Sequence, residues 1–425
     1  MTWAEPAALG FLALGLIVAI GIAARANEED RWWSSAMVYA ALGLGVAAAI
    51  HGLGIGWLEA EKDIAVIEHV AEAAVVVTLY ATGLQIDREL RLVGWRSVML
   101  LLVVVMPITI AAVALLGMGL LGLSLGAAIV LGAALAPTDP VLAGDVGVGP
   151  PGEDEPEARF SLTAEASFND GLAFPFLLAG LLIASDGGTG WITSWLLVDV
   201  LYKVVVGVVV GVAMGHLAAR VALPLRQNGR LGNDLDGWLA VAVALAVYGA
   251  AQVLSSYGFL AAICAGLAFR RFERDHEKHD ELHAGAQRIV QLLELGTIVL
   301  VMSMVTLTGL RAPGWEGWLI GVLLVFLVRP VAANAVLRKR WLKTPEERGF
   351  VAFFGVRGLG SIYYVGAALG TGVLDAGEAR TVLWTVIAAV LVSVLVHGVT
   401  AKAGILGLEH RARVEEEQGP ARAAA

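Results

Sequence analysis

The sequence predicts an all-α polytopic membrane protein of about thirteen transmembrane helices. Three observations lead to this prediction: an apolar composition, long apolar runs along the chain, and helix breakers inside two of those runs. The 425 residues are 58% hydrophobic and 16% charged, with a mean hydropathy of +0.76. A soluble chain is nearer half apolar and a quarter charged. Each apolar run of about 20 residues can cross roughly 30 Å of hydrocarbon as a helix.

The predicted spans follow one another with short connections. They cover residues 7–24, 36–57, 64–85, 97–121, 125–147, 158–184, 200–222, 237–255, 257–270, 288–310, 316–337, 349–370 and 380–404. The first run lacks the basic leader of a signal peptide, so we interpret it as the first helix. We expect residues 1–408 to form the transmembrane domain and residues 409–425 a short, charged cytoplasmic tail.

The distribution of Lys and Arg predicts the orientation. With the N-terminus outside, about 23 of the 29 basic residues lie in cytoplasmic loops and the tail. The others are Lys62, Arg311 and Arg380 outside and Lys203, Arg329 and Arg357 within spans. The positive-inside bias therefore predicts a cytoplasmic C-terminus in a multi-pass protein of the plasma membrane.

Two spans are interrupted by residues that break helices. The fifth contains Ala136 to Pro140, with the sequence Ala-Pro-Thr-Asp-Pro, and the twelfth contains Val356 to Ser361, with two glycines. These spans are seven apart, which predicts two inverted six-helix repeats joined by the seventh helix. We expect the broken helices 5 and 12 to cross at the midplane and form an ion site there.

The sixth span carries an acid cluster. Glu165 and Asn169 are four residues apart and share a helix face, with Asp170 about 100° further round. Each acid at mid-bilayer costs about 2.5 to 3.5 kcal/mol on insertion scales, so the cluster indicates function rather than packing. Burial lets a proton and a cation compete for Asp170, which predicts an exchanger.

The remaining polar residues of the spans supply partners for this cluster. Thr138 and Asp139 lie where prolines free backbone oxygens, a donor set suited to Na+, Li+ or K+; a surface turn is the alternative. Arg329 cannot lose its charge, so we expect it to pair with Glu165 unless it snorkels to the interface. Arg357 lies beside the second break and either binds freed carbonyls, neutralises the helix ends facing Asp139, or serves only packing.

At these residues the sequence resembles the monovalent cation:proton antiporter-1 family of bacterial and archaeal Na+/H+ exchangers, which are related to the eukaryotic sodium/proton exchangers. The resemblance covers nearly the whole chain. The marks are Leu79 to Leu84, the Thr-Asp of the first break, the Glu-x-x-x-Asn-Asp pattern from Glu165, Arg329 and the Arg357-Gly358 pair.

The resemblance implies that Asp170 alternates between a proton and a cation, with Thr138 and Asp139 completing a Na+ site. It also implies a buried bridge of Glu165 and Arg329 with Asn169 bonded into it, and a one-to-one, electroneutral exchange. A homodimer is implied as well, in which a core of helices 4–6 and 11–13 moves like an elevator against a dimerisation part built from the rest.

The chain departs from the family at Ala166, where members often have a serine after the glutamate. Ser167 follows, and we keep it as a candidate cation ligand. Glu72 in the third span is a further candidate acid of the ion path, as in some archaeal relatives, or else lines an aqueous funnel.

The sequence thus predicts a secondary transporter that exchanges Na+ or Li+ for H+ and serves pH homeostasis. The alternatives are a K+/H+ antiporter, or a cation channel or symporter without proton counterflow. We expect no cofactor, no enzymatic activity and no nucleic-acid partner, because the spans show no nucleophile-base pair or histidine set and the chain has no basic patch with interleaved aromatics. The expected partners are a monovalent cation, protons, membrane lipid and a second copy of the chain.

Overall fold

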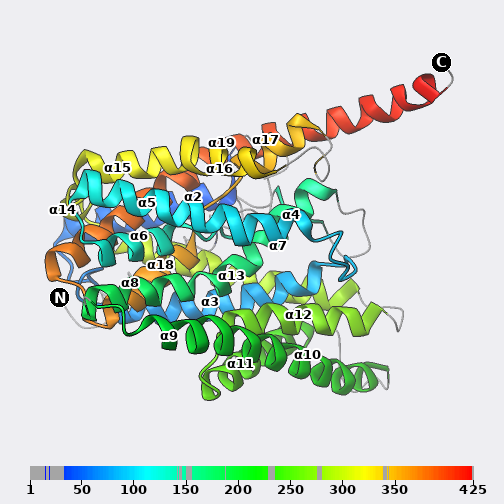
Figure 1. Cartoon of the computed structure of the whole chain (residues 1–425), viewed down its shortest axis with the longest axis horizontal. Coiled ribbons are helices and arrows are strands. Elements are labelled where there is room, and N and C mark those ends of the chain that lie inside the picture. The colour runs from blue at the N-terminus through cyan, green and yellow to red at the C-terminus, as the bar shows by residue number, and fades with distance from the viewer. Residues whose placement is uncertain are drawn as a thin grey trace.

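The protein folds as a bundle of long helices, seen in a computed structural model (Figure 1). The structure describes residues 15, 19, 33–140, 142, 146–149, 156–186, 188–227, 235–274, 280–337, 342 and 344–423. No β-strand occurs among these residues. The predicted span 7–24 and the acidic residues 153–155 lie outside the described parts apart from two isolated positions, residues 15 and 19. The all-α fold is confirmed.

The helices, with η for π-helical segments, have the following bounds. They are α2 (Ser35–Leu53), α3 (Ile64–Gln85), α4 (Arg96–Leu100), η2 (Leu101–Val105), α5 (Met106–Leu121), α6 (Leu125–Leu135), α7 (Glu157–Leu172), α8 (Phe174–Asp186), α9 (Ile192–Ser194), η4 (Trp195–Tyr202), α10 (Lys203–Gln227), α11 (Asp236–Val253), α12 (Gly258–Arg274), α13 (Asp280–Ser303), α14 (Leu307–Arg311), α15 (Gly314–Leu323), η6 (Leu324–Val328), α16 (Arg329–Val336), α17 (Pro345–Phe353), α18 (Leu359–Gly370) and α19 (Ala376–Ala423).

Many of these helices are suited to a bilayer. Within the described residues, eight helical segments are long and apolar enough to cross a membrane, and three shorter apolar helices accompany them. The shorter ones are 125–135 and 359–370, beside the two breaks, and 237–253. The chain is therefore a multi-pass membrane protein.

Several predicted boundaries are wrong, among them the start of the tenth span, which was predicted at residue 288 and lies at Asp280. The seventh span, predicted as 200–222, is helical from Ile192 to Gln227, because Asp199 and Lys203 pair within it at 2.6 Å instead of marking its end. The last helix, predicted as 380–404, runs from Ala376 to Ala423 and takes in most of the expected tail. A helix continues as long as its backbone hydrogen bonds do, whereas hydropathy follows only its apolar part.

Prolines shape two helices that flank the centre of the bundle. The π-helical segment η2 lies directly before the turn with Pro107, and η6 lies directly before the turn with Pro330. Proline has no N–H to give to the preceding turn, so the helix widens locally. These are the predicted spans four and eleven, again seven apart, and the second places Arg329 at its end.

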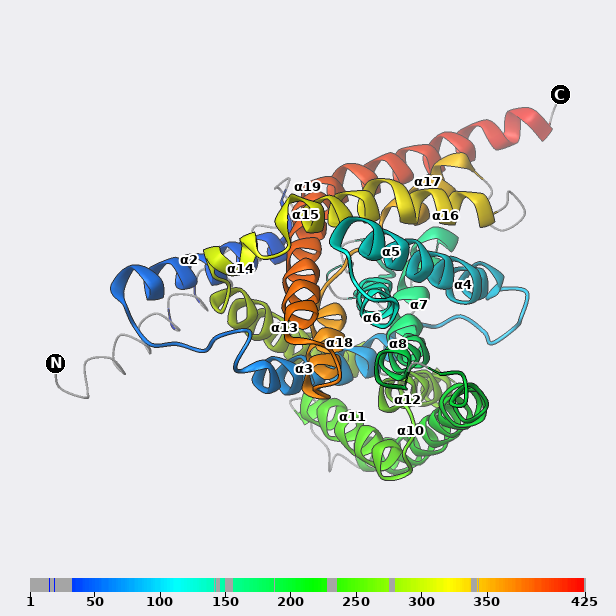
Figure 2. The ribbon, with the colours of Figure 1, turned by 60° about the vertical axis from the view of Figure 1, so that its left-hand side comes forward.

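Small residues let the helices approach closely. Gly207, Gly211 and Gly215 of α10 face α12, where an added Cβ at Gly207 would lie 3.0 Å from the Tyr257 carbonyl oxygen. A stripe of small residues at every fourth position is typical of packed membrane helices. In Figure 2, α10, α11 and α12 form one group of helices, while α15, α16 and α19 lie across the bundle from it.

The centre of the bundle holds α6, α7 and α18. Almost every described side chain of α6 from Gly126 to Leu135 is buried, and α6 packs against α5, α8 and α18. The two helix breaks, from Ala136 to Pro140 and from Phe354 to Gly358, therefore lie deep in the protein rather than at its surface.

Candidate functional site

The two predicted breaks face each other. The Asp139 N–H donates a hydrogen bond to the Val356 carbonyl at 2.8 Å, which joins the non-helical segment after α6 to the one before α18. Thr138 and Asp139 are 3% and 6% exposed. The alternative of a surface turn at this segment is therefore wrong, and helices 5 and 12 of the prediction are discontinuous where they meet.

Arg357 closes the open end of α6. Its Nη1 donates to the carbonyl of Ala136 and, at 2.8 Å, to that of Pro137, while its backbone N–H donates to Ser393 Oγ at 2.7 Å. The last carbonyls of a helix lack intrahelical partners and carry partial negative charge. Arg357 thus binds the freed carbonyls, which was one of the roles expected for it.

Asp139 has the complementary position at the start of α18. Its Oδ2 accepts the Leu359 N–H at 2.8 Å, and its Oδ1 accepts the Leu142 N–H at 3.1 Å. A carboxylate at a helix N-terminus satisfies unpaired N–H groups and matches the helix dipole. Gly358 has to be glycine here, because a Cβ at this position would overlap the Asp139 carboxylate.

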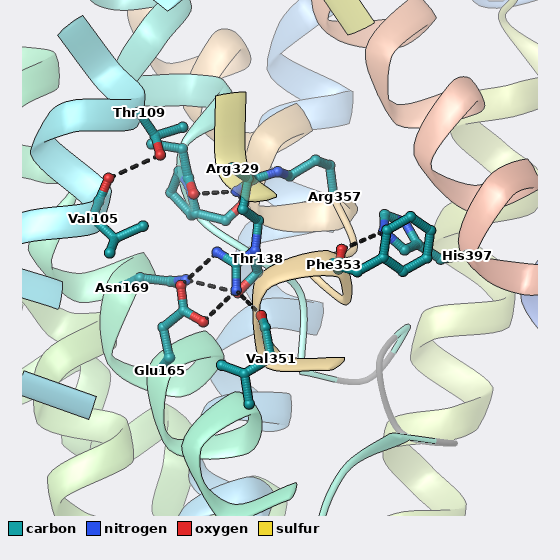
Figure 3. Close-up of polar contacts among 12 residues, drawn as sticks. Val105, Thr109, Thr138, Glu165, Asn169, Arg329, Val351, Phe353, Arg357 and His397 are labelled. Carbon is teal, nitrogen blue, oxygen red and sulfur yellow. Dashed lines mark hydrogen bonds and ion pairs between the residues drawn. The ribbon is translucent and has the colours of Figure 1, made fainter. Parts of the chain in front are cut away.

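Glu165 and Arg329 form a buried ion pair. Arg329 Nη1 donates to Glu165 Oε1 at 2.7 Å and Nη2 to Oε2 at 2.6 Å, and both side chains are at most 3% exposed (Figure 3). The fork geometry of guanidinium and carboxylate gives two parallel hydrogen bonds. The predicted pairing is confirmed, and the alternative in which Arg329 snorkels to the interface is wrong.

Asn169 does not join this bridge. Its Nδ2 donates to Thr138 Oγ1 at 2.8 Å, whereas its Oδ1 has no hydrogen-bond partner among the described residues. The implied bond between Asn169 and the Glu165–Arg329 pair is therefore wrong. Although Asn169 shares a helix face with Glu165, the broken segment after α6 presents a hydroxyl closer to the amide, and the amide bonds there.

Asp170 lies in the last turn of α7, where the helix is interrupted at Ala173 ahead of Pro175. Its carboxylate faces α18, because a Cβ on Gly360 would overlap Asp170 Oδ1. The side chain is 2% exposed, and Oδ1 has no hydrogen-bond donor within the described part of the chain. In contrast to Glu165 and Asp139, Asp170 Oδ1 meets neither an arginine nor a backbone N–H among the described residues.

The two remaining candidates among the predicted ligands and acids are placed as follows. Ser167 Oγ donates to the Thr163 carbonyl one turn earlier at 2.7 Å, so its proton is used within α7. Glu72 of α3 accepts a hydrogen bond from the Tyr248 hydroxyl of α11, which itself accepts one from Gln252 at 2.6 Å. Glu72 is thus engaged with α11, not with α7 or the two breaks.

Sequence reasoning missed His397 and Ser393 of α19. One ring nitrogen of His397 lies 3.0 Å from the Phe353 carbonyl oxygen (Figure 3), and the other lies 2.9 Å from the Ser393 carbonyl oxygen. Ser393 Oγ accepts the Arg357 N–H. These contacts hold the chain where α17 ends. The available signal was a serine and a histidine four residues apart inside an apolar run.

The charged groups at the two breaks have partners, whereas Asp170 Oδ1 has none among the described residues. Arg357 serves the carbonyl end of α6, Asp139 serves the N–H end of α18, and Arg329 neutralises Glu165. A buried carboxylate without such a partner has to be neutralised by a proton or by a cation. Asp170 Oδ1 has no such partner in the part of the chain that the structure describes.

Comparisons with known proteins agree with this geometry. The chain is 27% identical over 342 residues to Na(+)/H(+) antiporter 2 of Zygosaccharomyces rouxii and 28% identical over 345 residues to the Na(+)/H(+) antiporter of Saccharomyces cerevisiae. Each match covers 76% of this chain but only 42% and 34% of the yeast proteins. The chain therefore spans less than half the length of these relatives.

Solved structures share the fold. The sodium proton antiporter MjNhaP1 of Methanocaldococcus jannaschii at pH 8 superimposes with a TM-score of 0.71 at 17% identity, covering 93% of this chain and 99% of the other. A second structure of the same antiporter, from electron microscopy, gives 0.75 at 18% identity, with 96% and 98% covered. A family model described as sodium/hydrogen exchanger, transmembrane, matches residues 35–404. Because that match covers most of the chain, the protein belongs to the sodium/hydrogen exchanger family of membrane transporters.

Proposed function

We propose that this protein exchanges Na+ or Li+ for H+ across the plasma membrane, with Asp170 alternately protonated and bound to the cation. The observation that carries the proposal is the buried Asp170 carboxylate, whose Oδ1 has no donor in the described residues while the neighbouring charges are matched. Family membership and the antiporters that resemble the chain support the same activity.

The cation ligands that we propose are oxygens of Asp170, Asp139, Thr138 and Ser167. Asp139 and Thr138 already accept hydrogen bonds, but carboxylate and hydroxyl oxygens keep further lone pairs for a cation. Ser167 donates its proton to a backbone carbonyl, which leaves its oxygen free to act as an acceptor. An all-oxygen set without sulfur suits a hard monovalent cation.

A one-to-one exchange follows from the single uncompensated acid. One proton or one monovalent cation neutralises Asp170, so each form of the loaded site carries the same charge. We further propose that helices 4–6 and 11–13 of the predicted order form the moving core, that the other helices form a dimer contact, and that the N-terminus faces outward.

The Asp170→Asn variant tests the proposal. In acid-loaded proteoliposomes that contain a pH dye, we expect Na+ to drive proton efflux through the natural protein and not through Asp170→Asn, because an amide cannot exchange a proton. Asp375→Asn is the matched control, since Asp375 lies outside the spans and only caps Gly377. Unchanged exchange by Asp170→Asn would sink the proposal.

The same vesicles separate the alternative activities. A K+/H+ antiporter would respond to KCl more strongly than to NaCl or LiCl. A channel or cation symporter would take up the cation while the internal pH stays constant. The all-oxygen donor set is compatible with each of these ions, so the order of the three salts has to be measured.

A further inference from the structure

The first turns of α18 carry two buried hydroxyl groups to which no role has been assigned above. Ser361 and Tyr364 are 1% and 0% exposed, and neither Ser361 Oγ nor the Tyr364 hydroxyl has a hydrogen-bond partner among the residues described. A buried hydroxyl without a hydrogen-bond partner destabilises a protein, so such groups are rarely left without a use. Asp170 Oδ1 and Asn169 Oδ1 are unpartnered as well.

These hydroxyls lie on the side of α18 that faces Asp170. Gly360 and Tyr364 are four residues apart, Ser361 and Tyr364 three apart, so the three form one patch on the helix. Asp170 contacts this patch at Gly360. The Tyr364 side chain leans toward the N-terminal end of its helix, as long helical side chains do, and thus toward Gly360 and Asp170.

Ring packing fixes Tyr364 in this place. The Phe174 ring, one turn beyond Asp170, meets the Tyr364 ring edge to face with centroids 5.1 Å apart. Asp170 near the end of α7 and Phe174 at the start of α8 therefore lie beside Gly360 and Tyr364 of α18.

We propose that the Tyr364 and Ser361 hydroxyls are ligands of the cation that Asp170 exchanges, and that Tyr364 closes the site on the α18 side. The inference rests on the proposed function and deepens it by naming the specificity-determining oxygens. A hard cation that leaves water needs several oxygens around it. Ala166 brings no hydroxyl to this site, and the α18 pair provides two oxygens, one from Ser361 at the end of the second predicted break and one from Tyr364 three residues later.

Tyr364→Phe tests the proposal because it removes one oxygen and keeps the ring. We expect the apparent KM for Na+ to rise about tenfold, the effect of losing one polar partner, while the rate at saturating Na+ and the thermal unfolding midpoint stay near those of the natural protein. Ser361→Ala is expected to raise the KM and to change the ratio of the KM values for Na+ and Li+.

Tyr257→Phe is the matched control. The Tyr257 hydroxyl is also buried and unpartnered within the described chain, and its ring stacks on Phe174 at 5.1 Å. However, Tyr257 lies next to Lys203, whose Nζ is 5.8 Å from the ring centroid, rather than next to Asp170. We expect the KM of Tyr257→Phe to be unchanged.

Two results would overturn the inference. One is an unchanged KM for both Tyr364→Phe and Ser361→Ala, and the other is an equal rise in Tyr364→Phe and Tyr257→Phe, which would indicate a general effect of losing a buried hydroxyl. Failure of the proposed function looks different, because Asp170→Asn would then still exchange. If Tyr364→Phe does not fold, Ser361→Ala alone decides, through its KM for Na+ and its Na+ to Li+ ratio.

Discussion

At the scale of single residues, charge in an apolar span is the most informative signal. Arg329 cannot be neutral, so its pairing with a buried acid was predictable from the sequence, and the structure places it on both oxygens of Glu165. The partner of Asn169 was not predictable. Helical spacing puts Asn169 beside Glu165, but its amide bonds to Thr138, and that contact depends on how two helices meet.

Breaking the Glu165–Arg329 pair should destabilise the protein strongly. Removing one member by Glu165→Gln leaves a buried guanidinium without its counter-charge, which costs about 3 to 5 kcal/mol. Thermal unfolding in detergent should show this as a large drop of the midpoint. Lys62→Gln breaks the exposed pair with Glu59 and should leave the unfolding midpoint nearly unchanged.

The double variant Glu165→Leu with Arg329→Met completes the cycle. Since no buried charge is then left unpaired, its midpoint should lie above that of Glu165→Gln. A double variant as unstable as the single one would contradict a purely electrostatic role and would indicate that the shape of the pair supports the packing of α7 against α16 and α17.

At the scale of elements, the sequence predicted the helix breaks but not all the helix ends. Pro137, Pro140 and the glycines near Arg357 are local signals, because proline and glycine disfavour a helix whatever surrounds them. The pairing of Asp199 with Lys203 is a local i,i+4 signal, but the extension of the seventh span to Ile192 was missed because hydropathy places a charged residue at the end of a span. The contribution of α19 to the site was also missed, because His397 contacts carbonyls of another helix.

The contact between α7 and α18 at Gly360 gives a prediction at this scale. In Gly360→Ala the added methyl group would occupy the space of the Asp170 carboxylate, so we expect the exchange rate to fall at least about tenfold while the protein still folds. Gly349→Ala on α17 is the control, because a Cβ there meets nothing within 4 Å. Equal exchange rates in the two variants would show that the function of Asp170 does not depend on its contact with Gly360.

At the scale of the whole molecule, polar contacts join distant parts at the end of the bundle where α3, α6 and α19 begin. Glu61, in the loop before α3, accepts hydrogen bonds from Arg380 Nε and Trp384 Nε1 of α19, each at 2.8 Å. Glu378 accepts the N–H of Ser124, directly before α6, at 2.6 Å. These contacts link segments more than 250 residues apart, which no local sequence pattern reveals.

The contacts of Glu61 predict a pH dependence of stability. Partial burial raises the pKa of Glu61, but the hydrogen bonds from Arg380 and Trp384 and the charges of Arg380 and Lys62 outweigh it, so the pKa lies below 4.5. The pair therefore stabilises the fold above about pH 4.5, and this stabilisation is lost as the pH falls through the lowered pKa.

Arg380→Gln removes the main partner of Glu61. Its unfolding midpoint should lie slightly below that of the natural protein at pH 7, by no more than about 1 kcal/mol in stability because the pair is partly exposed, and the two should converge in acid. Arg91→Gln, in a more exposed pair with Glu89, should show no such convergence. If the difference in unfolding midpoint between Arg380→Gln and the natural protein grew toward low pH, the predicted direction of the pH dependence would be wrong.

The hydrogen bonds between residues 136–139 and 356–359 also have a mechanical consequence. They join the two broken helices, so the two helices have to move together as one rigid unit. In the proposed transport cycle, this unit would then slide along its contacts with neighbouring helices. At two of these, glycine provides the flat surface: Gly171 of α7 against Leu260 of α12, and Gly366 of α18 against Glu68 of α3. In the exchange that we propose, the ion site would therefore stay rigid while the helices that carry it slide along these glycine contacts.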